Sequence, residues 1–250
     1  PRPHNPGRRG GVTAGSALRI VSVFPELLGT YGDGGNIMVL GQRLAWRGVP
    51  HEVVTVALDQ PVPCSGDLYV LGGGEDDAQL VALAALRRNS GLIQALDGGA
   101  HVFGVCAGLQ LLGQRFDTAT GTAYDGLGVL DAVTTRLTRR AVGEVAAEFD
   151  AELALPTLTG FENHAGATTL GPAARPLATV TRGTGNGADG SRGEGALQGR
   201  VVATYLHGPV LARNPALADL LLSRALDRPL DELDPGPHEL LRRQRLAGLP

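Results

Sequence analysis

Ala100-His-Val-Phe-Gly-Val-Cys106-Ala-Gly-Leu-Gln-Leu-Leu-Gly-Gln-Arg115 contains a short apolar strand, a sharp turn flanked by glycines, and a helix that follows at once. Gly104 and Gly108 have no β-carbon, which lets the strand and the helix approach closely enough for such a turn. Cys106 is then expected at the helix N-terminus, where unpaired backbone N–H groups favour the thiolate over the thiol. The stretch therefore predicts a cysteine nucleophile. A small buried hydrophobic residue is the alternative interpretation of a free cysteine.

The chain on either side of this stretch predicts an α/β fold. Before it, strands are expected over 18–24, 51–58 and 67–71, and helices over 37–47 and 78–96. Short apolar strands that alternate with helices are typical of a mostly parallel sheet covered on both faces. After Phe116 the pattern changes to shorter, partly antiparallel strands, expected over 127–133, 144–149, 177–181 and 201–206. Two further helices are expected over 217–226 and 238–246.

Composition and charge narrow the class of protein. The 250 residues are 43% hydrophobic and 19% charged, which is enough to fill a core. We expect a flexible tail over 1–17, one domain over 18–227 and a C-terminal extension over 228–250. The net charge of −3 offers no electrostatic case for nucleic acid, and no apolar run reaches transmembrane length. The two cysteines form no disulfide framework and the first residues resemble no signal peptide, so we expect a reduced, cytoplasmic setting.

A cysteine nucleophile needs a base, and the fold must place that base. His207, in Ala203-Thr-Tyr-Leu-His-Gly-Pro209, follows an apolar strand, and active sites of open α/β sheets gather at such strand ends. His164, in Gly160-Phe-Glu-Asn-His-Ala-Gly166, is the second candidate because its position resembles a strand end. The other four histidines lie in the tail, in the extension or at strand starts: His4, His238, His51 and His101. His207 is the base that the sequence favours.

Acyl transfer also needs donors to an oxyanion. The backbone N–H of Ala107 is the natural first donor. Gly73 and Gly74, in the turn after the strand 67–71, are candidates for another, although an ordinary strand-to-helix turn also explains them. The acidic run Glu75-Asp-Asp77 fits the start of a helix better than a metal site, and no His or Cys spacing supports zinc. The six-glycine segment from Arg182 to Gly195 has no P-loop lysine and predicts a hairpin or a mobile loop.

Five motifs in order resemble one enzyme family. The Leu71-Gly-Gly-Gly74 turn, the Gly104–Gly108 elbow and Tyr205-Leu-His-Gly-Pro209 resemble the class I, triad-type glutamine amidotransferases, in the branch related to cobyric acid synthase. More narrowly, Thr30-Tyr-Gly-Asp-Gly-Gly-Asn36 and Gly160-Phe-Glu-Asn-His164 resemble the GatD family of glutaminase subunits. The likeness covers about residues 18–226. It implies a class I glutamine amidotransferase-like sandwich whose central, mostly parallel sheet is flanked by helices.

The resemblance implies roles for individual residues. Cys106 would attack the side-chain amide of glutamine, and His207 would shuttle the proton. Ammonia would then depart, and water would hydrolyse the glutamyl thioester that remains on Cys106. The glutamine-binding arginine of the family most resembles Arg140, with Arg139 as its rival, and Gln110 is a candidate for shaping the pocket.

One position departs from the family pattern. Many class I enzymes have a glutamate two residues after the catalytic histidine, where this chain has Pro209. The third triad member must therefore come from elsewhere, with Glu162 and Asp33 as candidates, or the site is a Cys–His dyad. The sequence does not choose between these alternatives.

The resemblance also implies a partner. GatD-family subunits work with MurT, a Mur-ligase-like subunit, in the heterodimeric lipid II isoglutaminyl synthase. That partner would bind ATP and Mg²⁺, so no cofactor is expected in this chain. The complex would amidate the D-glutamate α-carboxyl of lipid II to D-isoglutamine in peptidoglycan synthesis, at the inner face of the membrane. The alternatives are an amidotransferase for a cobyrinate-type acceptor, a cysteine hydrolase without a partner, and a catalytically idle binding or regulatory module.

Overall fold

The computed structural model describes residues 17–188, 190–234 and 236–247, so all but the last residue of the tail expected over 1–17 lies outside the described residues. The strands are β1 (Leu18–Val23), β2 (His51–Val56), β3 (Leu68–Leu71), β4 (His101–Val105), β5 (Arg115–Asp117), β6 (Ala123–Asp125), β7 (Ala132–Phe149), β8 (Leu158–Leu170), β9 (Ala178–Arg182), β10 (Gly193–Glu194), β11 (Ala196–Gln198), β12 (Val201–Thr204) and β13 (Leu206–His207). The α-helices are α1 (Gly34–Trp46), α2 (Asp76–Arg88), α3 (Gly91–Asp97), α4 (Ala107–Leu112), α5 (Val210–Arg213), α6 (Pro215–Leu226) and α7 (Gly236–Ala247). Among the described helices, none is long and apolar enough to cross a membrane.

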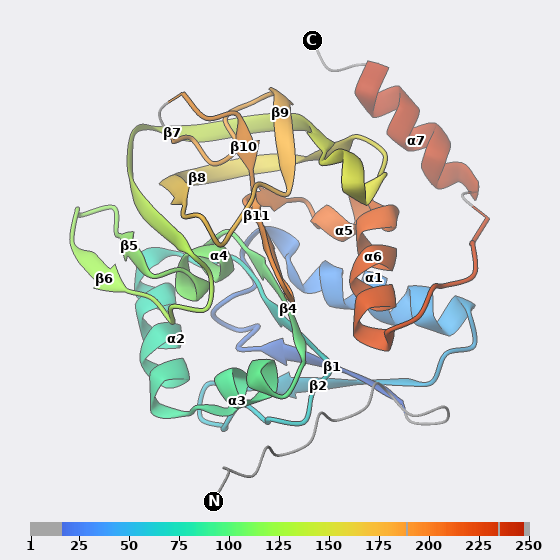
Figure 1. Cartoon of the computed structure of the whole chain (residues 1–250), viewed down its shortest axis with the longest axis horizontal. Helices are drawn as coiled ribbons and strands as arrows, with labels where there is room; N and C mark the ends of the chain where they lie inside the picture. Colours follow the sequence, from blue (N-terminus) through green and yellow to red (C-terminus); the bar gives the residue numbers. More distant parts are fainter. Residues whose placement is uncertain (1–16, 189, 235, 248–250) are drawn as a thin grey trace, which may run out of the picture.

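A six-stranded sheet in the order β11-β12-β4-β3-β1-β2 forms the centre of the molecule. Its strands pair in parallel except for β11, which runs antiparallel to β12. Helices α2, α3 and α4 lie on one side of this sheet, and α1 and α6 lie on the other (Figure 1). The predicted α/β architecture, a mostly parallel sheet covered on both faces, is confirmed.

Alternation along each central strand explains the two layers of helices. On β1, Val21 and Val23 belong to the apolar cluster that includes the leucines of α2 and α3. Leu18 and Ile20 belong to a second cluster, which includes the leucines of α1 and α6. Successive side chains of a strand point to opposite faces, so a strand buried on both faces reads as a nearly continuous apolar run. This is why β1, β3 and β4 could be predicted from local sequence.

Two glycines allow the turn between β4 and α4. A β-carbon on Gly108 would lie 2.5 Å from the carbonyl oxygen of Leu71, in the neighbouring strand β3. A β-carbon on Gly104 would lie 2.9 Å from Leu112 Cδ1 and 3.0 Å from the carbonyl carbon of Gly108. Both positions lack room for any side chain, which confirms the close approach predicted for this stretch.

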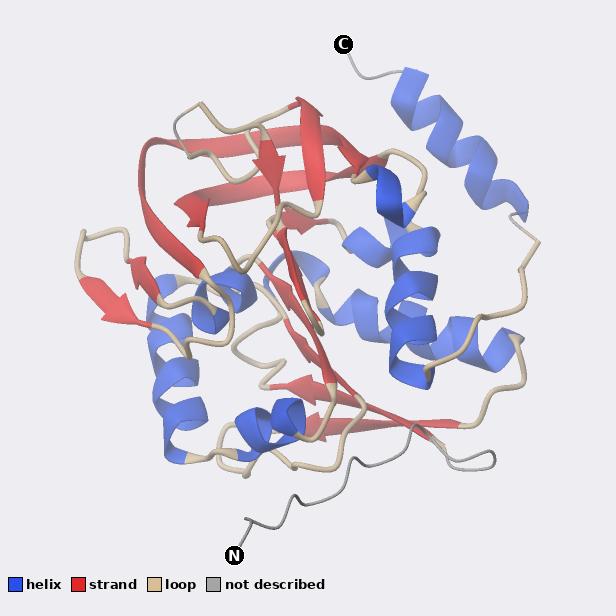
Figure 2. Ribbon diagram, in the orientation of Figure 1, coloured by secondary structure: helices blue, strands red, loops and turns tan. Residues whose placement is uncertain are grey.

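A second sheet lies above the first and is largely antiparallel (Figure 2). Its longest strand, β7, has 18 residues and pairs antiparallel with β8 and β9. The prediction of a strand over 127–133 is wrong for most of its length, because β7 begins only at Ala132. Leu127 and Leu130 instead donate their backbone N–H groups to Leu111 and Leu112 at the end of α4. The strand expected over 144–149 is the last third of β7, and β5, β6 and β8 were not predicted as strands.

The helix expected over 78–96 is also wrong as one element. It consists of α2 and α3, separated by Asn89 in an extended conformation. A β-carbon on Gly91 would lie 1.8 Å from the carbonyl oxygen of Val62, so the second helix begins where a loop packs directly on the backbone. Propensity alone favours one continuous helix here, and tertiary packing overrides it.

The described part of the glycine-rich segment 182–195 is tied to its neighbours by backbone hydrogen bonds. Thr168 donates to the carbonyl of Asn186, and Asn186 donates to the carbonyl of Gly193. Strand β10, which closes the segment, pairs antiparallel with β9. The hairpin interpretation of this segment agrees with the structure better than the mobile loop.

The extension predicted from residue 228 contains α7, which lies outside the helical layers of the core (Figure 1). Arg242 is its buried anchor and donates to Asn214 Oδ1 and to the carbonyl of Thr157. Leu240 and Leu241 on the same helix are exposed. The helix is therefore attached through a polar residue rather than an apolar face.

Candidate active site

Cys106 stands between β4 and α4 as the first residue outside the helix. Its backbone has φ +52° and ψ −103°, in a region that L residues rarely adopt. Its N–H donates to the carbonyl of Thr204 at 2.8 Å, and its carbonyl accepts from Gln110 at 3.2 Å. The strained turn is held from both sides, as the nucleophile-elbow pattern predicts. The side chain is partly buried and unbonded to Cys64, since both are free cysteines.

His207 and Asp33 form a buried pair at the carboxyl ends of the central strands. Nδ1 of His207 lies 3.1 Å from both carboxylate oxygens of Asp33, and both side chains are 1% exposed. Burial alone would lower the pKa of His207. The hydrogen bond to Asp33 and the proximity of Cys106 outweigh burial and raise the pKa to about 10. His207 is therefore an imidazolium at neutral pH, beside the cysteine.

Asp33 reaches His207 because the start of α1 packs on the segment that follows the histidine. A β-carbon on Gly35 would lie 2.3 Å from Pro209 Cγ, so this glycine allows the close approach. Next to it, Asn36 Oδ1 accepts a 3.0 Å hydrogen bond from the N–H of Leu211. Pro209, where the family pattern has glutamate, is thus part of the contact that delivers a different carboxylate.

Glu162, the other candidate for the third position, is occupied elsewhere. Its carboxylate accepts the N–H groups of Thr184 and Gly185 at 2.8–3.1 Å. Burial raises its pKa, but the nearby imidazole of His164 and the hydrogen bonds from these two N–H groups outweigh burial, so the pKa is lowered overall. Glu162 fixes the glycine-rich segment, and the geometry of a Cys106–His207–Asp33 triad leaves it out.

Gly73 lies where the three triad residues converge. A β-carbon there would be 2.7 Å from His207 Cε1, 3.0 Å from Asp33 Oδ2 and 3.5 Å from Cys106 Cβ. Its N–H donates to Asp33 Oδ2 at 2.8 Å. In this arrangement the N–H of Gly73, a predicted oxyanion donor, is used by the carboxylate of Asp33. Gly74, which lines the adjoining cavity, and Ala107 remain the predicted donors.

The triad opens on a cavity of about 300 Å³, a volume suited to a small ligand. Arg140 lines this cavity together with Cys106 and His207, whereas Arg139 is absent from its lining. The structure thus favours Arg140 over its rival as the cavity's cation.

A polar chain crosses the mouth of this cavity. Arg140 donates from Nε to Asn163 Oδ1 at 2.6 Å and from Nη2 to the carbonyl of Asn163 at 3.3 Å. Asn163 in turn donates from Nδ2 to the hydroxyl of Tyr31 at 2.7 Å. The ring of Tyr31 meets His207 edge-on, with centroids 4.9 Å apart. Asn163 therefore fixes the guanidinium of Arg140 through a neutral group, and Tyr31 covers the imidazole.

Gln110 and His164 line the same cavity. Gln110 accepts from Gln79 Nε2 at 2.9 Å and donates to the hydroxyl of Tyr205 at 3.3 Å, so its amide is held in place. His164 lies in the middle of β8, not at a strand end as predicted. It donates from Nδ1 to the carbonyl of Gly166 and stacks on Tyr205, with centroids 3.9 Å apart. His164 therefore lines the cavity as a packed side chain and makes no hydrogen bond to His207 or Asp33.

Sequence reasoning missed three residues of this site. Arg136 adds a second cation to the cavity lining, and Asn163 and Tyr31 support Arg140 and His207. Tyr31 has a φ of +60°, which is unusual for a residue other than glycine. The four glycines around it predicted only a loop. Among the described residues, no group of three or more His, Cys, Asp or Glu is arranged to hold a metal ion.

Comparison with known proteins agrees with this geometry. The model of the CobB/CobQ-like glutamine amidotransferase domain matches residues 19–215. The chain is 35% identical to the GatD subunit of the glutamine-hydrolyzing lipid II isoglutaminyl synthase of Staphylococcus aureus (strain N315), over 84% of this chain and 85% of that protein. The corresponding subunit of Streptococcus pneumoniae (strain ATCC BAA-255 / R6) is 34% identical, over 84% and 81%. A crystal structure of a glutamine amidotransferase shares the fold, with a TM-score of 0.58 at 21% identity, over 84% of this chain and 99% of that one.

The charge on His207 is expected to depend on Asp33. In the unaltered protein, the imidazole should titrate near pH 10 by NMR. Because this folded-state pKa is above the ordinary value of 6.5, protonated His207 stabilises the fold at neutral pH, and that contribution is lost as pH rises through about 10. Asp33→Asn should lower the midpoint by about one pH unit or more, since it removes the charged partner. Asp97→Asn, at an exposed position at the end of α3 and outside the cavity lining, is the control and should leave the midpoint unchanged, whereas an unchanged midpoint in Asp33→Asn would contradict the pairing.

Proposed function

This chain belongs to the CobB/CobQ-like glutamine amidotransferase domain family, and we propose that Cys106, His207 and Asp33 hydrolyse L-glutamine as the glutaminase subunit of a lipid II isoglutaminyl synthase. The observation that carries the proposal is the convergence of these three side chains on Gly73, at the edge of a cavity that Arg140 also lines. A strained cysteine, an imidazolium and a buried carboxylate are the parts that acyl transfer through a thiolate requires.

The chemistry proceeds in two steps. The Cys106 thiolate attacks the side-chain amide carbon of glutamine and forms a C–S bond, while His207 gives its proton to the departing nitrogen. The C–N bond breaks and ammonia departs. A γ-glutamyl thioester remains on Cys106. Neutral His207 then takes a proton from water, whose oxygen attacks the thioester carbon. The C–S bond breaks to release glutamate, with His207 protonated and Cys106 again a thiolate.

Asp33 and Tyr31 support His207 in this cycle. The carboxylate accepts from Nδ1, which fixes the tautomer of the neutral imidazole and leaves Nε2 directed toward the cysteine. The ring of Tyr31 limits the access of water to the imidazole edge. The N–H groups of Ala107 and Gly74 stabilise the oxyanion formed in each step.

Arg140 binds the free α-carboxylate of glutamine. Its Nε is held by Asn163, so the outer edge of the guanidinium stays available for a two-point contact. Gln110, fixed between Gln79 and Tyr205, shapes the base of the pocket for the amide side chain. These contacts place the scissile amide against Cys106.

The ammonia is used by a partner. Both GatD relatives are subunits of a glutamine-hydrolyzing lipid II isoglutaminyl synthase, and they support a complex in which this chain is the glutamine-hydrolyzing part. The partner is a MurT-like ligase that binds ATP and Mg²⁺ and activates the D-glutamate α-carboxyl of lipid II. Its product is D-isoglutamine in the peptidoglycan precursor, made at the inner face of the membrane.

Removal of the nucleophile is expected to abolish glutamine hydrolysis. Cys106→Ser should reduce glutamate release by about a thousandfold or more, because the hydroxyl replaces the reactive thiolate. Cys64→Ser is the matched control, since that cysteine is exposed and remote from the cavity lining. Glutamate should be measured for the chain alone and with its ligase partner. Equal activity of Cys106→Ser and Cys64→Ser would refute the assignment of the nucleophile.

Arg140→Ala is expected to cause a severe loss of glutamine turnover, with KM raised about tenfold or more, because the α-carboxylate loses its cation. Arg139→Ala makes the same chemical change one position away and should remain close to the unaltered enzyme. Circular dichroism and thermal unfolding should show that both variants are folded. A larger loss in Arg139→Ala than in Arg140→Ala would reassign the substrate-binding residue.

The acceptor is tested by reconstitution. The chain purified with its Mur-ligase-like partner, ATP, Mg²⁺ and glutamine should convert one carboxyl of lipid II into an amide, a loss of about 1 Da in mass spectrometry. The reaction with Cys106→Ser should proceed only when ammonium replaces glutamine, because the ligase no longer receives ammonia from this subunit. Active glutaminase without amidated lipid II would indicate another acceptor, such as a cobyrinate.

A further inference from the structure

A second groove lies on elements that take no part in the glutaminase site. It has a volume of about 330 Å³. Its walls are the segment 172–175, the end of β11 with Gly199, and Arg224 on α6. The first two walls are joined by a pair of backbone hydrogen bonds between Arg175 and Leu197, at 3.1 and 2.8 Å. The groove is thus built on a fixed frame rather than on a loose loop.

Arg224 brings an uncompensated cation to this groove. Its Nη1 is buried and has no hydrogen-bond partner among the described residues, and no described carboxylate acts on its charge. A buried donor without an acceptor costs free energy, and the cost is larger for a charged group. Burial and the neighbouring Arg175 both lower the pKa of Arg224. The groove therefore places the guanidinium of Arg224 near that of Arg175.

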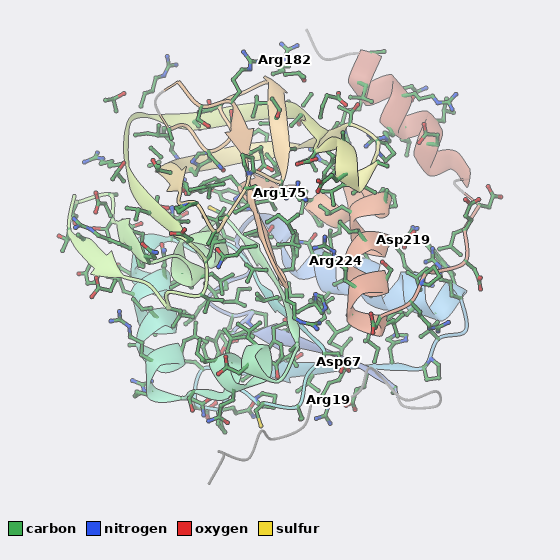
Figure 3. The ribbon with its side chains drawn as sticks, in the orientation of Figure 1. Arg19, Asp67, Arg175, Arg182, Asp219 and Arg224 are labelled. Carbon is green, nitrogen blue, oxygen red and sulfur yellow. The ribbon has the colours of Figure 1, made fainter. Side chains whose placement is uncertain are left out.

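Four other partly buried arginines of this chain are paired with carboxylates. Arg43 and Arg47 share the carboxylate of Asp219, and Arg213 bonds both oxygens of Glu144. Arg175 bonds Asp150 through Nη1 and Glu152 through Nη2, and its Nε has no acceptor among the described residues. Figure 3 shows Arg224 beside α6, with Arg175 above it. Arg224 differs from these residues because the acceptor it lacks would have to come from outside the described chain.

We propose that this groove binds a phosphate group between Arg224 and Arg175. A tetrahedral phosphate presents oxygens in several directions and can accept from two guanidinium groups that approach from different elements. A planar carboxylate is satisfied by one guanidinium fork. Gln198 does not compete for the anion, because its side-chain amide already bonds the N–H of Asp131 and the carbonyl of Val129.

The remaining walls indicate what carries the phosphate. Pro172, Ala173, Ala174 and Leu197 give the groove an apolar side, and the volume exceeds what one phosphate needs. A phosphate attached to a small organic group fits this combination. The group can belong to a free metabolite or to a lipid headgroup, and the two sources present the same chemistry to the arginines.

The test uses the full chain and Arg224→Gln. Calorimetric titration with inorganic phosphate and with pyrophosphate, at constant ionic strength, should show one site in the unaltered chain. Arg224→Gln should weaken binding about tenfold or more, since a charged hydrogen-bond donor is lost. Arg228→Gln removes the same charge at an exposed position just after α6 and should bind as the unaltered chain does. Acetate should show no measurable binding to the unaltered chain or to either variant.

Thermal unfolding separates ligand binding from a structural role. Without anion, Arg224→Gln should unfold at the same or a higher temperature than the unaltered chain, because it removes a buried charge that has no partner. With pyrophosphate, the unaltered chain should gain stability and Arg224→Gln should not. A marked loss of stability in anion-free Arg224→Gln, absence of binding, or equal binding by both chains would each overturn the proposal.

Vesicles distinguish the two sources. Sedimentation with phosphatidic acid in phosphatidylcholine vesicles, compared with phosphatidylcholine alone, should be Arg224-dependent if a headgroup is the ligand. Binding of soluble phosphates without vesicle binding assigns the groove to a free phosphorylated metabolite. Because glutamate release is not a readout in any arm, failure of this proposal leaves the glutaminase assignment untouched, and the converse also holds.

Discussion

The contact between Asp33 and His207 is the interaction on which the site depends. It joins residues 174 positions apart, and it is possible only because Gly35 lets the start of α1 pack against Pro209. Gly73 sits at the centre of the contact and donates its N–H to the carboxylate. A side chain at Gly73 would crowd His207 and Asp33 and would contact Cys106. Backbone packing, more than the reactivity of one side chain, therefore sets the geometry of the triad.

The two sheets divide the work of this site. The parallel sheet supplies the reacting groups, because the ends of β3 and β4 carry Gly73 and Cys106 to one edge. The antiparallel sheet supplies the walls, because β7 and β8 place Arg140 and Asn163 opposite that edge. His207 belongs to both layers, since β13 pairs with β8 directly after β12 ends. The cavity forms where the layers meet.

The parts of this arrangement that could be predicted are the ones with a local signal. Apolar runs identified β1, β3 and β4, and the glycines on either side of Cys106 identified the elbow. The strand β7 was missed over most of its length because residues such as Arg136 and Thr135 are exposed and its pairing with β8 supplies the stability. Asp33 remained one of several candidates because its role depends on a contact across the whole chain. The local sequence around Asn163 gave no indication of its role, since that role is to connect Arg140 with Tyr31.

The partner given to each charged group explains what that group does. His207 has the carboxylate of Asp33 beside it, which raises the pKa of the imidazole and keeps it protonated until substrate binds at Cys106. Arg140 has a neutral amide beside it, which orients the guanidinium without cancelling its charge, so the cation still attracts a carboxylate. Arg224 has no described acceptor at Nη1, so that donor is open to an acceptor from outside the chain. At these three residues, the carboxylate partner of His207 serves an internal proton transfer, and the two arginines without a carboxylate partner are the ones to which we assign ligands.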